Sequence, residues 1–398
     1  MNVTMTRCAH HLSTLADAHS AVAEGVVSLR QQLEGTLPSF VMLFASASHA
    51  GKLADAVQSV RDELGTRHVI GCTAESVAGG GREIEGEDAL AMWAIHLPDV
   101  QVDSFRLAFA RTPEGGVFEG WPDEALGDWP SDSCLLLLGD PFSFPADFLL
   151  ERFNEDRPGV KVVGGMASGA STPGANRLIL GSTTYSEGAV AVLLRGPSGL
   201  RTVVSQGCRP IGKPLVVTKA ERNILIELGG RPALEQLKKV YDELPTREQQ
   251  LFQRGLHVGR VVSEYQESFT AGDFLIRNVV GIDPRNGAVA VGDFFRPGQT
   301  VQFHLRDQET ADDDLKQLLR DLSSDSSVKA AGALLFTCNG RGTRLFAQPH
   351  HDAQCIQQAL GEIPLAGFFA AGELGPVGQE NFMHGFTASI AVFTRKSD

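Results

Sequence analysis

The sequence lacks the clustered positive charge that nucleic-acid and membrane-surface proteins carry. Its 35 lysine and arginine residues are outnumbered by 48 aspartate and glutamate residues, which gives a formal net charge of −13 at pH 7. Phosphate backbones are bound through clustered Lys and Arg, and anionic lipid surfaces attract basic segments. We therefore expect neither a nucleic acid nor a membrane among the partners.

Long apolar runs and paired cysteines are absent as well. No apolar stretch reaches the roughly 18 residues that span a bilayer, and residues 1–20 have no apolar core of the kind that a secretory signal requires. The six cysteines are widely scattered and form no CxxC pair, as is typical of free thiols in a reducing compartment. These absences predict a cytoplasmic protein.

The common enzyme motifs are also missing. There is no phosphate-binding loop, because Gly51-Lys52 continues into Leu53, and no GxGxxG opens a helix after a strand. The run from Gly165 to Gly169 places Ser168 one residue late for a nucleophile elbow, and HExxH is absent. We expect no enzymatic activity, no metal and no bound cofactor.

What the sequence does contain is a repeated strand–helix–strand–strand unit. In the first copy, an apolar run at 41–44 precedes a helix at 53–64 whose apolar residues recur at i, i+3, i+4 and i+7. A strand at 68–72, a glycine corner at 78–81 and a strand at 89–95 complete the unit. Two further copies keep this order. Their elements lie at 135–138, 145–153, 162–165, 168–171 and 188–195, and at 333–336, 352–360, 365–368, 372–376 and 386–393.

The spacing within the copies supports their relation. The end of the first strand and a glycine of the second strand are 27, 26 and 31 residues apart in the three copies. These pairs are Phe44 and Gly71, Leu138 and Gly164, and Phe336 and Gly367. A recurrence of this kind is typical of a protein assembled from related units.

The repeat and the length predict the fold class and the domains. At 398 residues the chain is too long for one ordinary domain. We predict an α/β (α+β) fold of two related domains, built from the repeated units and containing mixed sheets. A helical lead-in is expected at 1–35, an N-terminal domain at 36–218 and a C-terminal domain at 219–395.

One strand end carries a high density of polar residues. The strand at 333–336 runs into Cys338, Asn339 and Arg341, the position at which open α/β sheets bind ligands. Arg341 offers a planar fork suited to a carboxylate, which is either that of a ligand or one inside the protein. Cys338 is either a buried thiol or, beside a base, a nucleophile.

Polar residues also stand at the corners of the other copies. Glu373 follows a second strand, where its carboxylate accepts from a ligand amine or forms an internal salt bridge, and His384 lies downstream. Glu75 and Ser168 fall near the matching corners, so pseudo-symmetric copies would bring these corners to one cleft. The candidate ligand-binding residues are Asn339, Arg341, Glu373, Cys338, His384, Ser168 and Glu75.

These segments resemble a known family. The runs at 338–342, 372–376 and 384–387 resemble the C-terminal FIST domain, and those at 70–75 and 163–165 resemble its N-terminal partner. Near Glu75 the chain has Thr-Ala-Glu-Ser, where the family pattern has a glycine before the acid. The resemblance covers about residues 36 to 395.

The resemblance implies a cytoplasmic sensory protein that binds a small ligand, with an amino acid or related carboxylated metabolite as the suggested class. Relatives often fuse the domain to a kinase, cyclase or F-box output, whereas here about 36 residues precede it and almost none follow. We therefore expect signalling through a protein partner or an oligomer. Two alternatives stay open. One is a haem-binding gas sensor with His384 as axial ligand, and the other is a hydrolase-type enzyme that uses Cys338 or Ser168.

Overall fold

The protein is described by a computed structural model that covers residues 5–113, 115–130, 132–266, 268–269, 271–325 and 329–395. Its contacts group the chain into two compact units. The repeat unit comprises Met1–Val204 and Lys316–Asp398, and the inserted unit comprises Ser205–Leu315. The division predicted between residues 218 and 219 falls inside strand β15 (Cys208–Glu221) of the inserted unit.

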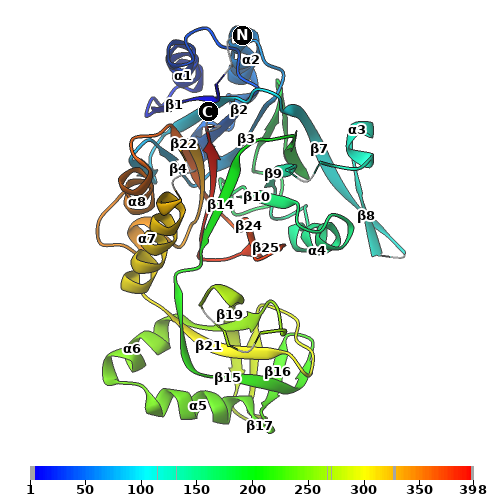
Figure 1. Ribbon diagram of the computed structural model, residues 1–398, viewed down its shortest axis with the longest axis vertical. Coiled ribbons are helices and arrows are strands. Elements are labelled where there is room, and N and C mark those ends of the chain that lie inside the picture. Colours follow the sequence, from blue (N-terminus) through cyan, green and yellow to red (C-terminus); the bar gives the residue numbers. More distant parts are fainter. Residues whose placement is uncertain are drawn as a thin grey trace. The chain divides into compact units, whose positions relative to one another are not determined.

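Each predicted repeat forms two parallel strands joined by a crossover helix, with a third strand antiparallel beside them (Figure 1). The first repeat consists of β2 (Phe40–Ser46), α2 (Leu53–Leu64), β3 (Val69–Ala74) and β6 (Leu90–His96). The second consists of β9 (Cys134–Gly139), α4 (Ala146–Asp156), β10 (Lys161–Met166) and β13 (Ala189–Arg195), and the third of β22 (Ala330–Cys338), α8 (His351–Leu360), β23 (Leu365–Ala370) and β26 (Ala388–Thr394). The predicted α/β class with mixed sheets is confirmed.

The repeated glycine has the same packing role in all three copies. A Cβ atom on each of these glycines would lie 1.9–2.0 Å from a carbonyl oxygen of the neighbouring parallel strand. The pairs are Gly71 and Leu43, Gly164 and Leu137, and Gly367 and Leu335. Only a residue without a side chain permits this approach, which explains why glycine recurs at this point of the sequence.

The three repeats exchange their hairpins in a cycle. The first repeat's hairpin, β4 (Ser76–Gly79) and β5 (Arg82–Glu85), pairs with β23 of the third repeat. The third repeat's hairpin, β24 (Glu373–Val377) and β25 (Glu380–His384), pairs with β10 of the second. The second repeat's hairpin, β11 (Leu178–Leu180) and β12 (Thr183–Tyr185), pairs with β3 of the first. Each sheet therefore contains strands from two repeats.

Three sheets result, and their inner faces share one apolar core. The strand orders are β1-β6-β2-β3-β11-β12, β25-β24-β10-β9-β13-β7-β8 and β14-β26-β22-β23-β4-β5. Rings from two repeats meet in this core, where Phe44 lies 6.3 Å from Phe336 and 5.0 Å from Phe368 between centroids. The outer faces are covered by helices, with α1 (Ala18–Gln32) and α2 on the first sheet and α4 on the second. The edges are extended by β7 (Gln101–Thr112), β8 (Gly115–Glu119) and β14 (Leu200–Ser205), and the short helix α3 (Asp123–Leu126) follows β8.

The N-terminal segment differs from the expected helical lead-in. It contains strand β1 (Arg7–Ser13), which pairs antiparallel with β6, before helix α1 begins. The difference has a tertiary cause, because β6 presents an open edge to which a seven-residue segment can add. Asp17 then caps α1 by accepting from the backbone of Ser20.

The inserted unit is a closed sheet with its own core. Its strand order is β15-β21-β18-β19-β20-β16-β17, and β16 also pairs with β15, which closes the ring (Figure 1). The strands are β16 (Ile224–Leu228), β17 (Arg231–Pro232), β18 (Leu256–Val261), β19 (Phe274–Asp283), β20 (Ala288–Val291) and β21 (Thr300–Arg306), and helices α5 (Ala233–Glu243) and α6 (Thr246–Gly255) complete the unit. Helix α7 (Gln308–Ser324) contains the boundary between the units. Within the described residues, no helix has the length and apolar character needed to cross a bilayer.

Candidate functional site at the junction of the repeats

The strand-end corners of all three repeats meet at Ser168. Its hydroxyl accepts a hydrogen bond from the backbone N–H of Glu75 in the first repeat (2.9 Å). The same hydroxyl donates to the backbone carbonyl of Phe369 in the third repeat. The structure thus brings together the corners that the pseudo-symmetry argument predicted to converge. Ser168 itself joins backbone groups of the two other repeats.

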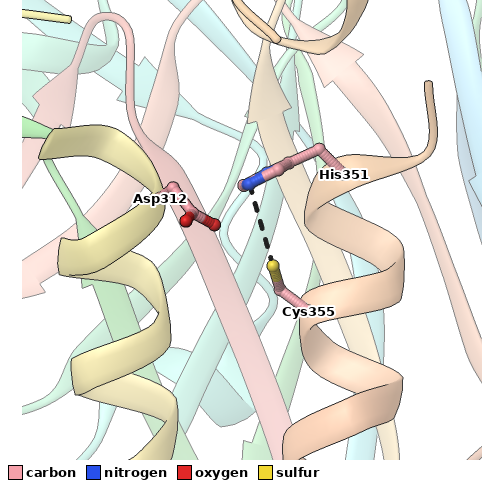
Figure 2. A group of neighbouring side chains, drawn as sticks. All are labelled: Asp312, His351 and Cys355. Atoms are coloured by element: carbon pink, nitrogen blue, oxygen red, sulfur yellow. Dashed lines mark hydrogen bonds between the residues drawn. The ribbon is translucent and has the colours of Figure 1, made fainter. Parts of the chain in front are cut away.

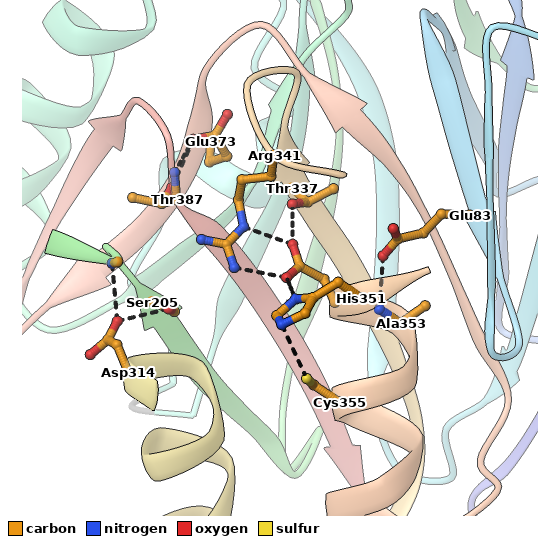
Figure 3. A network of polar contacts seen from close by, with 12 residues as sticks. Glu83, Ser205, Asp314, Thr337, Arg341, His351, Ala353, Cys355, Glu373 and Thr387 are labelled. Carbon is orange, nitrogen blue, oxygen red and sulfur yellow. Dashed lines mark hydrogen bonds and ion pairs between the residues drawn. The ribbon is translucent and has the colours of Figure 1, made fainter. Parts of the chain in front are cut away.

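Arg341 belongs to the loop that follows β22, and its side chain is fully buried. Its Nε and Nη2 each donate to Asp352 on helix α8 at 2.7 Å, and Thr337 Oγ1 donates to the same carboxylate at 2.6 Å (Figure 3). Burial alone would raise the pKa of Asp352, but Arg341 and these hydrogen bonds hold that pKa well below its usual range. Of the two interpretations of Arg341, the structure shows the pairing with an internal carboxylate.

His351 extends this buried network along helix α8. Its Nδ1 lies 2.9 Å from Asp352, and its Nε2 lies 3.8 Å from the thiol of Cys355. Figure 2 draws His351 and Cys355 with their hydrogen bond, and Figure 3 adds Asp352. The ring also stacks on Phe346, with centroids 3.4 Å apart. Burial lowers the pKa of His351, but the hydrogen bonds to Asp352 and Cys355 raise it to about 10. The imidazole is therefore protonated at neutral pH and adds a second cation beside Asp352.

A carboxyl group of the first repeat reaches the same helix. Glu83 on strand β5 accepts from the backbone N–H of Ala353 at 2.9 Å (Figure 3). Its own N–H donates to Nδ1 of His350, the residue that precedes α8. Burial and the nearby charge of Asp352 raise the pKa of Glu83 to about 8. The exchanged hairpin thus places an acid at the N-terminus of a helix that belongs to another repeat. A helix N-terminus favours negative charge, but here burial and Asp352 outweigh that effect on the pKa of Glu83.

Glu373 is buried at the corner of the third repeat. Its Oε2 accepts from the N–H of Thr387 at 3.0 Å and from the Thr387 hydroxyl at 2.7 Å. Burial raises the pKa of Glu373 to about 8, although hydrogen bonds from Thr387 and Cys338 oppose the shift. His384, which pairs with Glu373 across the hairpin, is 2 % exposed, and its Nε2 lies 3.0 Å from the carbonyl of Gly375.

Besides Glu85, which accepts from Thr343, the accessible charged groups at the junction are Arg344 and Glu75. They form an ion pair between the third and the first repeat, with side chains that are 57 % and 39 % exposed. Arg344 Nη1 also donates to the backbone carbonyl of Asn339 at 2.8 Å. Oδ1 of Asn339 is buried and accepts a hydrogen bond from no described residue. A guanidinium, a carboxylate and an unused amide oxygen therefore lie around one loop.

The predicted candidate residues differ in how far they are buried. Arg341, Glu373 and His384 are buried and bonded within the protein, whereas Glu75, Cys338 and Asn339 are partly exposed. Arg344, Asp352, His351 and Glu83 are not among the residues predicted from the sequence. An acid in the first turn of a helix is common for electrostatic reasons, so no sequence signal indicates that Asp352 pairs with Arg341.

Comparison with known families identifies both halves of the chain. The FIST N domain matches residues 39–231, and the FIST C domain matches residues 233–376. The two matches meet within the inserted unit, near strand β17. Both therefore extend over residues of the repeat unit and of the inserted unit.

Similar full-length proteins occur in mycobacteria. An uncharacterized protein of Mycobacterium tuberculosis H37Rv is 42% identical over 382 residues, which cover 96% of this chain and 98% of the relative. An uncharacterized protein of Mycobacterium bovis is 41% identical over 380 residues, covering 96% and 97%. Among solved structures, a cyanuric acid hydrolase from A. caulinodans covers 99% of this chain and 100% of its own, at 9% identity and a TM-score of 0.29. A TM-score this low does not establish a shared fold.

Proposed function

This chain belongs to the FIST family, whose domains are sensory, ligand-binding domains, and from that premise we propose that it senses a small carboxylated metabolite, such as an amino acid, in the cytoplasm. The observation that carries the proposal is the part-exposed Arg344–Glu75 ion pair at the junction of the repeats. Arg341 is unsuited to the same task because its fork is already filled by Asp352.

The groups at the junction match an amino acid in both of its charges. A ligand carboxylate takes the place of Glu75 on the guanidinium of Arg344, which suits planar bidentate recognition. A ligand ammonium pairs with the displaced carboxylate of Glu75, whose side chain is partly exposed. Exposed ion pairs contribute only about 0–1 kcal/mol, so the exchange of Glu75 for a ligand has a low cost.

Ligand binding at this point also supplies a signal. Glu75 belongs to the first repeat and Arg344 to the third, so breaking their ion pair loosens one link between repeats. A protein partner or a second copy of the chain would detect this change. The signal is thus passed on by a change of surface and needs no catalytic step.

The geometry favours neither of the alternatives. His384 is buried against the Gly375 carbonyl, which leaves it poorly placed to bind haem iron. The Ser168 hydroxyl is bonded to two backbone groups, and the Cys338 thiol lies beside the acid Glu373. Burial keeps Glu373 mostly protonated at neutral pH, so it is poorly suited to take a proton from the thiol as an activating base would.

The proposal is tested by calorimetry and thermal denaturation with a panel of amino acids and related carboxylic acids. At about one hundred times its Kd, a ligand that binds only the folded protein raises the free energy of unfolding by about 2.7 kcal/mol. Arg344→Gln should abolish this increase. Arg61→Gln, which changes an exposed arginine of helix α2, should retain it.

Two results would contradict the proposal. One is a panel in which no compound shifts the unfolding transition of the wild-type protein. The other is a ligand whose affinity is the same in Arg344→Gln as in Arg61→Gln, because recognition would then occur elsewhere on the chain.

A further inference from the structure

A hollow lies in the repeat unit, lined by residues other than the corner residues described above. It has a volume of about 510 Å³ and is formed by strand β8, helix α3 with the loop after it, and helix α4. This size falls in the range of small-molecule pockets, about 300–1,000 Å³. Neither the family match nor the corner site gives this pocket a role.

Aromatic rings dominate the wall of this pocket. Trp121 and Phe153 are nearly parallel, with an interplanar angle of 21° and centroids 6.5 Å apart, and Trp129 lies 5.4 Å from Phe153 and 6.4 Å from Trp121. Phe118 contributes a further ring. Trp121 and Trp129 are only partly buried, so the pocket exposes ring surface that a completed core would cover.

One ring face already holds a cation. The guanidinium of Arg157 lies 4.8 Å from the centroid of Trp129, within the distance at which a cation is attracted by the ring quadrupole. The pocket therefore has the electrostatic character that cation–π binding requires. The same Arg157 donates to the carbonyl of Ala125 only at 3.5 Å, which is a weak hydrogen bond.

Negative charge is available at the rim. Asp128 and Asp156 line the pocket and are exposed, and no ion pair joins either of them to another described residue. Asp156 is the last residue of α4, where the helix carbonyls add partial negative charge. The net charge of −13 further attracts cations and repels anions over a longer range.

We propose that this pocket is a second ligand site, which binds a flat organic cation by stacking on Trp121, Trp129 and Phe153 and by charge pairing with Asp128 and Asp156. Arg152 and Arg157 also line the pocket, so an anionic ligand is the competing prediction. Their side chains lie over the rings of Phe148 and Trp129, whereas the two carboxylates carry no such contact. The two carboxylates are therefore the charged lining groups that have no ring or ion-pair partner among the described residues and are available to pair with a ligand.

The test is a series of ring-matched probes measured by titration calorimetry on the full chain. N-methylquinolinium is the cation, methylnaphthalene the neutral compound and naphthoate the anion. We expect the cation to bind about tenfold more tightly than the neutral probe and the anion to bind most weakly. The double variant Asp128→Asn, Asp156→Asn should remove the advantage of the cation. Glu151→Gln, an exposed carboxylate of α4 that does not line the pocket, should keep it.

The variant Arg157→Gln distinguishes a cationic from an anionic ligand. It should leave binding of the cation unchanged or tighter, because it removes a competitor for the face of Trp129. If naphthoate binds more tightly than the cation, or if Arg157→Gln weakens the cation, the proposal is overturned. The same holds if Trp121→Leu binds the cation as the wild type does, provided that circular dichroism shows the variant to be folded. None of these results depends on whether Arg344 binds a carboxylate.

Discussion

At the scale of single residues, the buried charge of Asp352 is stabilised at the junction by hydrogen-bond donors and by charges of opposite sign. Asp352 receives two hydrogen bonds from Arg341, one from Thr337 and one contact from His351. A fully buried ion pair repays its desolvation only with such geometry. Glu373 differs, since its hydrogen-bond partners are a threonine and a thiol, and burial outweighs both these bonds and the nearby charge of Arg341. With a pKa raised to about 8, this carboxyl is held mostly in its protonated form at neutral pH.

The raised pKa of Glu373 predicts how stability depends on pH. Its folded pKa of about 8 lies above the ordinary value of 4.5, so the folded state binds the extra proton between these values. The stabilisation is complete below pH 4.5 and is lost as the pH rises to 8. Glu373→Gln stays neutral throughout and should show a shallower loss of unfolding free energy between pH 5 and pH 8. Urea denaturation at several pH values measures it. Glu380→Gln, on an exposed carboxylate of β25, should follow the wild type, and parallel curves for wild type and Glu373→Gln would contradict the prediction.

At the scale of elements, the parallel strand pair of each repeat depends on one glycine. The pairs β2–β3, β9–β10 and β22–β23 bring a carbonyl oxygen against the position where a Cβ would be. Strand separation in a sheet is set by the backbone hydrogen bonds at about 4.8 Å. The strands therefore cannot move apart to admit a methyl group without losing part of the ladder.

Gly367→Ala tests this packing directly. Its Cβ would lie 1.9 Å from the Leu335 carbonyl oxygen and 2.7 Å from the carbonyl carbon, so β22 and β23 must separate. We expect a loss of about 3 kcal/mol, at the upper end of ordinary overpacking effects, measured by denaturant unfolding. Gly51→Ala, whose Cβ would meet nothing within 4 Å, should cost less than about 1 kcal/mol. Equal losses in both variants would refute the argument.

At the scale of the whole molecule, the exchange of hairpins makes the three repeats interdependent. Each sheet of the repeat unit is completed by strands of another repeat, and the inner faces share one core. Trp93 of the first repeat donates to the Pro364 carbonyl in the third and lies 5.3 Å from Phe393. No repeat can therefore lose its structure without exposing the core of the others.

This interdependence predicts that the repeat unit unfolds in one step. Trp93 reports on the shared core, and Trp121 with Trp129 reports on the outer face of the second sheet. The variant Trp121→Phe, Trp129→Phe isolates the first signal, and Trp93→Phe isolates the second. Adding Ser168→Ala to each should lower the free energy of unfolding by the same amount in both fluorescence signals. We expect a loss of about 1–3 kcal/mol for the lost hydrogen bonds. A shift in one signal alone would show that the repeats unfold separately.

The sequence by itself determined the repeat, the fold class and the family, because these depend on local periodicity and on glycine positions that recur along the chain. It also identified the strand-end corners as the polar part of the molecule. Only the tertiary structure decided which repeat completes which sheet, and that β1 adds to an open edge. The tertiary structure alone distinguished the environments of Arg341 and Arg344, two arginines that lie three residues apart in the sequence. The first is buried on Asp352 and the second is exposed beside Glu75. Arg341 pairs within its own repeat, with an acid 11 residues away. Arg344 pairs with Glu75, which tertiary structure brings from 269 residues away, and no local pattern encodes such a neighbour.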